Sequence, residues 1–204
     1  MQKKPFLIAA AVAVLLAAAA LLVFGRSGPP SDASPEAGFA RDMAVHHAQA
    51  VEMSFLVYDR STSPEVRTLA FDIINTQAAQ RGMFMGWLQQ WGLRQAGDRP
   101  PMAWMVGHGH GGTEQRPDAM PGMATKQELD RLRSLKGRDA EILFLQLMIR
   151  HHQGGVKMAE AALKLAERPE VVTMARQIVT GQSGEITLMT DYLKQRGAQP
   201  LPGS

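Results

Sequence analysis

Apolar residues after position 38 recur at alternating intervals of four and three, which is the spacing of one face of a helix. His46 lies on the same stripe. Ser63, Pro64 and Glu65 then supply an N-cap, a proline suited to a first helical turn and an early acidic residue, so a second helix is predicted there. Residues 38–92 are therefore predicted to form a helical hairpin. The stripe of its first helix consists of Phe39, Met43, Ala50, Met53 and Val57.

The hairpin pattern occurs twice. Positions 39–92 align without a gap on positions 144–197, and 16 of these 54 pairs are identical. Average residue usage would give about three or four identities by chance, so the match indicates an internal duplication. Residues 138–198 are therefore predicted to form a second hairpin. Two such hairpins predict an all-α protein built as a four-helix bundle, with a pseudo-two-fold axis relating its halves.

The N-terminus predicts export. An unbroken apolar run, Phe6–Phe24, follows Lys3 and Lys4 and is long enough to span a bilayer as a transmembrane helix. The two lysines favour the cytoplasmic side, which places the rest of the chain outside the cytoplasm. Small residues at Ala18 and Ala20 keep open a cleaved signal peptide, which would leave a secreted or periplasmic protein. We expect the membrane anchor, because the apolar run continues past those alanines.

Glycine and proline interrupt the segment between the hairpins, so it cannot form one regular element. Near its end, Thr125 and Glu128 form a capping box that predicts a short helix. The predicted organisation is a signal anchor or signal peptide at 1–26, a flexible tether at 27–37, the first hairpin at 38–92, a Met/His/Gly/Pro-rich connector at 93–124, a short helix at 125–137, the second hairpin at 138–198 and a tail at 199–204.

The composition narrows the chemistry. The chain has no cysteine, which excludes disulfides, thiolate metal sites and cysteine nucleophiles, and leaves its 13 methionines as the only soft sulfur ligands. The formal charge of +3 comes from Lys3, Lys4 and Arg26, because the other 19 basic residues balance 19 acidic ones. The excess of positive charge therefore lies in the N-terminal segment 1–26, and no nucleic-acid partner is expected.

One string of potential metal ligands occurs in both hairpins. Met43 precedes His46 and His47 by three and four residues, so on a helix these side chains share a face, with Cβ atoms about 5–6 Å apart. Imidazole nitrogen with thioether sulfur suits copper, especially Cu(I), whereas histidine alone would also suit another transition metal such as zinc or nickel. Bundle cores build metal sites from facing helices. The candidate ligands are Met43, His46, His47, Met53, Met148, His151, His152 and Met158.

The connector holds a second group of candidate ligands. His108 and His110 flank a glycine, and Met120 and Met123 flank a Pro-Gly turn, an arrangement that suits weak, exchangeable capture of a soft metal. The alternative is a Gly/Pro-rich linker in which these residues are incidental. Four further polar positions are interpreted as hydrogen-bonding partners rather than catalytic groups: Gln77, Gln80, Gln182 and Glu185.

A structural interpretation stands beside the metal site, because methionines often fill cores and buried histidines often need only a hydrogen-bond partner. The sequence contains no Glu-x-x-His, His-Glu-x-x-His, P-loop or Gly-x-Ser-x-Gly motif, and no general base or substrate-binding motif. We therefore predict that the protein is not an enzyme. A metal-dependent oxidase stays open, and it would need a coordination position free for substrate.

The strings Phe144-Leu-Gln-Leu-Met148-Ile-Arg-His151-His152-Gln-Gly-Gly-Val156-Lys-Met158-Ala159 and Met120-Pro-Gly-Met123-Ala-Thr resemble the bacterial family known as domain of unknown function 305. The resemblance covers about residues 38–197. It implies a ferritin-like four-helix bundle that is often exported, and an association of some members with copper binding and copper tolerance through Met and His residues. The chain departs from the family pattern at Gly154-Gly155, where Gly-Ala is commoner, and at Arg150, where proline is frequent.

Three functions follow from these observations. The first is an extracytoplasmic metal-binding protein that binds copper, as Cu(I) or Cu(II), and buffers it or delivers it. The second is a structural or interaction bundle with no bound metal, and the third is the oxidase. The expected partners are a metal ion and, through the N-terminal helix, a membrane, while assembly into a homo-oligomer stays open.

Overall fold

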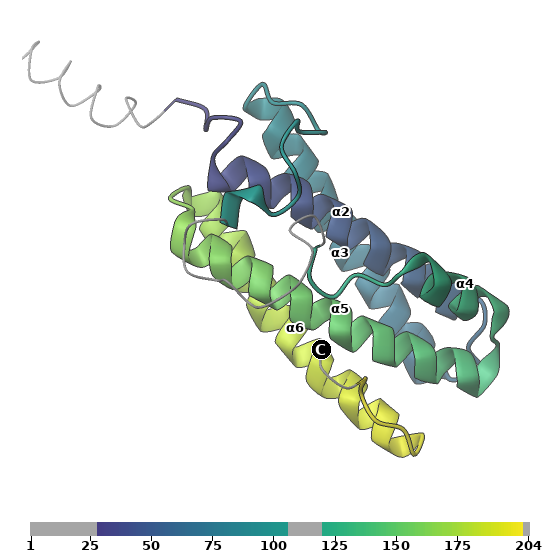
Figure 1. Ribbon diagram of the computed structural model, residues 1–204. Coiled ribbons are helices and arrows are strands. Elements are labelled where there is room, and N and C mark those ends of the chain that lie inside the picture. The colour runs from purple at the N-terminus through teal and green to yellow at the C-terminus, as the bar shows by residue number, and fades with distance from the viewer. Residues whose placement is uncertain (1–27, 106–119, 202–204) are drawn as a thin grey trace, which may run out of the picture. The chain divides into compact units, whose positions relative to one another are not determined.

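A computed structural model describes residues 28–105 and 120–201 of the chain. These residues form five α-helices and one short 3-10 helix, and they contain no strand, which confirms the predicted all-α class. No helix among them is long and apolar enough to cross a membrane. The apolar run Phe6–Phe24 lies outside the described residues, so the N-terminal transmembrane helix stays a prediction. The elements are α2 (Pro35–Tyr58), α3 (Pro64–Gln90), η1 (Ala103–Met105), α4 (Lys126–Ser134), α5 (Gly137–Leu165) and α6 (Pro169–Gln195) (Figure 1).

Local sequence signals set the starts of these helices. Ser63 caps α3 by accepting a hydrogen bond from the backbone N–H of Val66, and Pro64 occupies the first turn. The capping box predicted for α4 is confirmed: the Thr125 side chain accepts from the backbone of Glu128, and the Glu128 carboxylate accepts from the Thr125 backbone. Helices α3 and α4 thus begin where nearby side chains satisfy backbone N–H groups that have no partner inside the helix, whereas α5 and α6 begin without a side-chain cap.

The long helices pack as two hairpins joined through their first helices. Helix α2 packs along α3, α5 packs along α6, and α2 also packs on α5 (Figure 1). Helices α2 and α5 are antiparallel, because Phe39 near the start of α2 shares a cluster with Met158 in the second half of α5. The remaining helices, η1 and α4, both contact α2. This arrangement brings the middle of α2 against the middle of α5.

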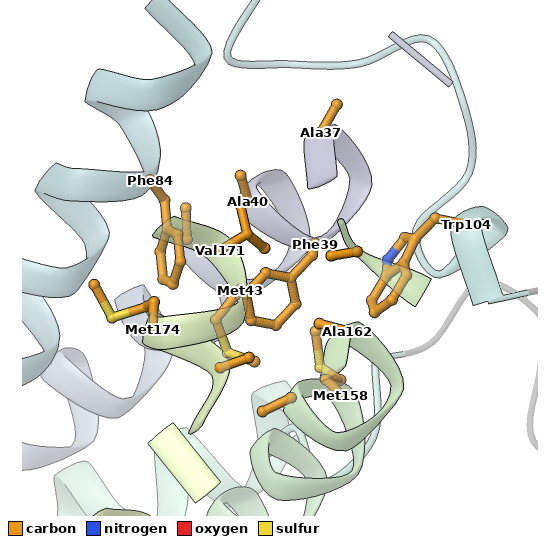
Figure 2. Packing of buried hydrophobic residues seen from close by; sticks show 14 of the residues in the cluster. Ala37, Phe39, Ala40, Met43, Phe84, Trp104, Met158, Ala162, Val171 and Met174 are labelled. Atoms are coloured by element: carbon orange, nitrogen blue, oxygen red, sulfur yellow. The ribbon is translucent and has the colours of Figure 1, made fainter. Parts of the chain in front are cut away.

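The core divides into two apolar clusters. The first cluster gathers the start of α2 and the end of α3, and in it the Phe39 and Phe84 rings meet edge to face with centroids 5.6 Å apart. Figure 2 shows this cluster, with Met43, Met158 and Met174 among the aromatic rings. The second cluster gathers the opposite halves of the four long helices. Its largest fully buried members are Met53, Ile73, Leu132, Phe144, Leu145, Leu147, Met148 and Ile149.

In each hairpin, a buried glutamate at the start of the first helix accepts hydrogen bonds from the turn of the other hairpin. Glu141, at the start of α5, accepts hydrogen bonds from the backbone N–H groups of Thr62 and Ser63 in the α2–α3 turn, and it forms a 2.9 Å ion pair with Arg196. Glu36, the residue 105 positions earlier, accepts from the backbone N–H of Glu167 in the α5–α6 turn. The burial of Glu141 raises its pKa, but the hydrogen bonds from Ser61, Arg196 and Ser63 outweigh that effect and hold it below 4.5. These two glutamate–turn contacts hold the hairpins against each other and so determine where α2 meets α5.

Candidate metal centre

The four hairpin histidines form one buried layer between the two apolar clusters. We call His46, His47, His151 and His152 the histidine layer; none of their side chains is exposed to solvent. His46 on α2 and His151 on α5 occupy equivalent positions in the repeat, and their rings lie against each other with centroids 3.7 Å apart. The layer thus lies at the pseudo-two-fold crossing of the hairpins, where each repeat supplies the same residues.

Oxygen acceptors fix the orientation of three of the rings. The Nε2–H of His46 donates to the backbone carbonyl of Pro121 at 3.1 Å. The Nε2 atom of His47 lies 2.7 Å from the amide oxygen of Gln80, and that of His152 lies 2.6 Å from a carboxylate oxygen of Glu185. Since these oxygens can only accept, each Nε2 carries the proton and each Nδ1 keeps a free lone pair.

Those lone pairs are buried without a partner. The Nδ1 atoms of His46, His47 and His152 have no hydrogen bond, and neither ring nitrogen of His151 has a well-aligned one. The side-chain amides of Gln77 and Gln182, which are also buried, have no partner either. Most buried polar atoms in proteins are hydrogen-bonded, so a concentration of unpaired polar atoms in one layer needs an explanation. An imidazole whose Nε2–H is held by an oxygen and whose Nδ1 is free has the arrangement of a metal ligand with its supporting hydrogen bond.

Burial keeps His46, His47 and His151 uncharged. Desolvation lowers the pKa of His46 to about 4, although the hydrogen bond to Pro121 works in the opposite direction. Burial, and then the neighbouring His46, lower the pKa of His47 to about 3. The pKa of His151 is lowered well below 6.5 by burial and then by the other three histidines. These imidazoles are therefore neutral at physiological pH, which is the protonation state that coordinates a metal.

The candidate methionines lie on both sides of the layer. All four are fully buried; Met43 and Met158 belong to the first cluster, and Met53 and Met148 to the second. Met43 and Met148 each precede a histidine pair by three and four residues, which keeps the thioether on the adjacent helical turn. Met53 and Met158 follow the pairs by six and seven residues, about 9–10 Å along the helix axis. By this spacing, Met43 and Met148 lie closer along their helices to the histidine pairs than Met53 and Met158 do.

The Met120–Met123 turn covers the layer. Its backbone reaches between the hairpins, where Pro121 accepts the hydrogen bond from His46 and Gly122 adopts a left-handed φ of +76°. Gln49 holds the next residue, Ala124, by two reciprocal hydrogen bonds of 2.7 and 2.9 Å. Met120 and Met123 are half-buried, and Met120 packs against the first cluster. The other connector candidates, His108 and His110, lie outside the described residues.

Arg150 and Gly155, at which the sequence departs from the family pattern, each make a specific contact in the structure. Arg150 makes hydrogen bonds of 2.6 and 2.8 Å to the Glu128 carboxylate and one to the Met123 carbonyl, so it ties α4 and the covering turn to α5. A Cβ on Gly155 would lie 2.4 Å from the amide oxygen of Gln182. Glycine at this position leaves room for that amide, which can move because it ends a flexible side chain.

Gly154 allows the covering turn to pack closely against α5. A Cβ at this position would lie 2.0 Å from the Pro121 carbonyl oxygen, which is backbone and cannot rotate away. We therefore expect Gly154→Ala to lower the free energy of unfolding by about 1–3 kcal/mol, the usual cost of overpacking, and to break the hydrogen bond from His46 to Pro121. Denaturant unfolding measures the first effect, and the imidazole nitrogen resonances of His46 measure the second.

The matched control for Gly154→Ala is Gly184→Ala on α6, where an added Cβ meets nothing within 4 Å. That replacement should be neutral or stabilise by up to about 1 kcal/mol, as alanine usually does at an open helical position. Equal effects of the two substitutions would contradict close packing of the turn at Gly154.

Several site features were not evident from the sequence. The covering role of Pro121 depends on a backbone carbonyl, which leaves no signature in residue type. The equivalence of Glu36 and Glu141 was detectable, because the two residues are separated by the repeat offset of 105 positions. Both residues precede the aligned stretch, so the alignment did not include them. In the described residues, no group of three or more His, Asp or Glu side chains is arranged to hold a metal ion.

Comparisons with known proteins identify relatives. The family described as "Domain of unknown function (DUF305)" matches residues 36–193. A DUF305 protein from Streptomyces coelicolor, inferred to be secreted, is 47% identical with a TM-score of 0.77, covering 84% of this chain and 99% of that one. A DUF305 fragment from Deinococcus radiodurans is 37% identical with a TM-score of 0.64, covering 79% and 96%. CopM in its Cu(II)-bound form is 28% identical with a TM-score of 0.59, covering 79% and 97%. No curated protein matches the chain.

Proposed function

Since this chain belongs to the DUF305 family, we propose that it is a copper-binding protein that holds the ion in the histidine layer together with Met43 and Met148. The observation that carries the proposal is the set of three buried Nδ1 lone pairs without partners, each on a ring whose Nε2–H is held by an oxygen. Thioether sulfur beside neutral imidazole selects a soft ion, which makes Cu(I) the preferred state.

A structural relative supports the choice of metal. CopM, which is 26–28% identical over most of this chain, has been solved in Cu(I)-bound and Cu(II)-bound forms. The pairs of adjacent histidines in both hairpins and the buried Met43 and Met148 give the present chain nitrogen and sulfur donors of the same types that bind both copper states in proteins. The predicted export places this donor set outside the cytoplasm. The proposed role is therefore to buffer copper there or to pass it on.

The alternative role is a structural helical bundle without metal. It is favoured by the close contact of the His46 and His151 rings and by the hydrogen bonds that already hold His47 and His152. In that case the histidine layer serves to align the two hairpins, and its orphan nitrogens are a cost of that alignment.

Thermal unfolding of the purified full-length chain with and without Cu(I) separates the two roles. A ligand that binds only the folded state adds about 2.7 kcal/mol at a hundredfold excess over Kd. For a domain of this size we expect a rise in Tm of about 5–10 °C with Cu(I) and a smaller rise with Zn²⁺, which does not favour thioethers. An unchanged Tm in the presence of excess Cu(I) would reject copper binding and favour the structural bundle.

A further inference from the structure

The two halves of the histidine layer differ in one supporting residue. In the first hairpin, His47 is held by the neutral amide of Gln80 at 2.7 Å; in the second, His152 is held by the carboxylate of Glu185 at 2.6 Å. Gln80 and Glu185 occupy equivalent positions in the repeat, 105 residues apart. Among the described residues, Glu185 is the one carboxylate that hydrogen-bonds a histidine of the layer. The pseudo-symmetry is therefore broken in charge, although the hydrogen-bonding geometry is almost the same.

A carboxylate and an amide do not support a metal-bound imidazole equally. A carboxylate that accepts the Nε2–H makes the imidazole a stronger donor at Nδ1, and its negative charge offsets part of the charge of the bound ion. That compensation matters because the His152 side chain has no exposure, and unpaired charge is costly in such surroundings. Glu185 itself retains 26% side-chain exposure, so it lies at the edge of the layer where solvent reaches it.

We propose that this difference sets an order of binding in which the first copper ion binds at His152 and His47 coordinates copper only afterwards. The reason is that Glu185 makes the Nδ1 atom of His152 the strongest donor of the layer. The inference rests on the proposed copper-binding function and assigns Glu185 as a positioning residue that acts through His152. Gln80 is its weaker counterpart. The duplicated histidine pairs are thereby made unequal by a single Gln-to-Glu difference.

The test uses Cu(I), which is diamagnetic, and nitrogen-resolved NMR of the imidazole rings of the full-length chain. In the unaltered chain, the Nδ1 resonance of His152 should shift with the first additions of Cu(I), before that of His47. Glu185→Gln should lower the affinity for the first ion by about 10–100-fold, as the loss of a supporting hydrogen-bond partner usually does. The variant keeps an oxygen acceptor for Nε2–H, as Gln80 does in the first hairpin, so its free energy of unfolding should change little.

The reciprocal exchange is the decisive variant. In Gln80→Glu/Glu185→Gln, the charge moves to the first hairpin, so His47 should respond first and much of the lost affinity should return. A structural effect of Glu185 alone would not be restored by a carboxylate placed on another helix. Equal responses of His47 and His152, or an order unchanged by the exchange, would overturn the inference while leaving copper binding intact. If no variant takes up Cu(I), both this inference and the proposed function are overturned.

Discussion

The metal-free protein should lose stability between pH 6.5 and pH 5, a range in which most carboxylates remain ionised. The pKa of His46 is about 4 and that of His47 about 3 in the folded chain, against 6.5 in the unfolded chain. Below pH 6.5 the unfolded chain therefore takes up protons that the folded chain excludes, and the unfolded state is stabilised. Each such histidine lowers the free energy of unfolding by about 1.4 kcal/mol per pH unit, down to its folded pKa.

Two to three histidines acting together should cost about 4–6 kcal/mol between pH 6.5 and pH 5, which is a large share of a typical stability of about 5–15 kcal/mol. Above about pH 7.5 they contribute no pH dependence, because they are then neutral in both states. The pKa values of Glu128 and Glu141 are lowered from 4.5, so these carboxylates lose their contribution only at lower pH. Urea unfolding at half-unit steps of pH measures the slope.

The control for the acid effect is His47→Gln, which retains a buried polar side chain but cannot take up a proton. The slope between pH 6.5 and pH 5 should fall by about 1.4 kcal/mol per pH unit in this variant. A free energy of unfolding that is flat over this range in the unaltered chain would show that the histidine layer is hydrated and not buried.

Replacement of all four layer histidines by glutamine should abolish tight copper binding. We expect the affinity for Cu(I) to fall by at least about 100-fold, because the loss of ligating nitrogens exceeds the 10–100-fold cost of losing a supporting partner. Glutamine is chosen because it is close to histidine in size and polar, as are Gln77 and Gln182 nearby, and because an amide is a poor ligand for a soft ion. Competition against a chromogenic Cu(I) chelator measures the affinity.

The matched control places the same substitution in the connector. His108→Gln/His110→Gln removes the only other histidines of the chain, and the layer should then keep its affinity within a few-fold. The reverse result, a large loss in the connector variant and none in the layer variant, would move the copper site from the bundle to the connector.

The internal repeat made much of this arrangement predictable. An ungapped alignment of 39–92 on 144–197 predicted two hairpins, and the equivalence of His46 with His151 pointed to the place where they meet. Helix starts at Pro64 and Pro169 followed from proline itself, because its fixed φ and missing N–H suit a first helical turn. These features depend on spacing along one helix or on residue type, which a sequence displays directly.

The rest depends on contacts between distant segments. The sequence placed Met53 on one stripe with His46, but it did not show that this side chain packs in the second apolar cluster together with Met148. The carbonyl of Pro121 reaches His46 across 75 positions, and the buried carboxylate of Asp42 accepts from Trp104 across 62 positions. Such partners are set by how the connector folds back over α2, and no local pattern encodes that path.

X-ray absorption at the copper edge of the Cu(I)-loaded, full-length chain tests the central claim most directly. We predict that both imidazole nitrogen and sulfur are bound to the ion, and that the sulfur signal disappears in Met43→Leu/Met148→Leu while it persists in Met53→Leu/Met158→Leu. Coordination by nitrogen and oxygen alone, or a sulfur signal that survives the first pair of substitutions, would contradict a copper site formed by the histidine layer with these two methionines.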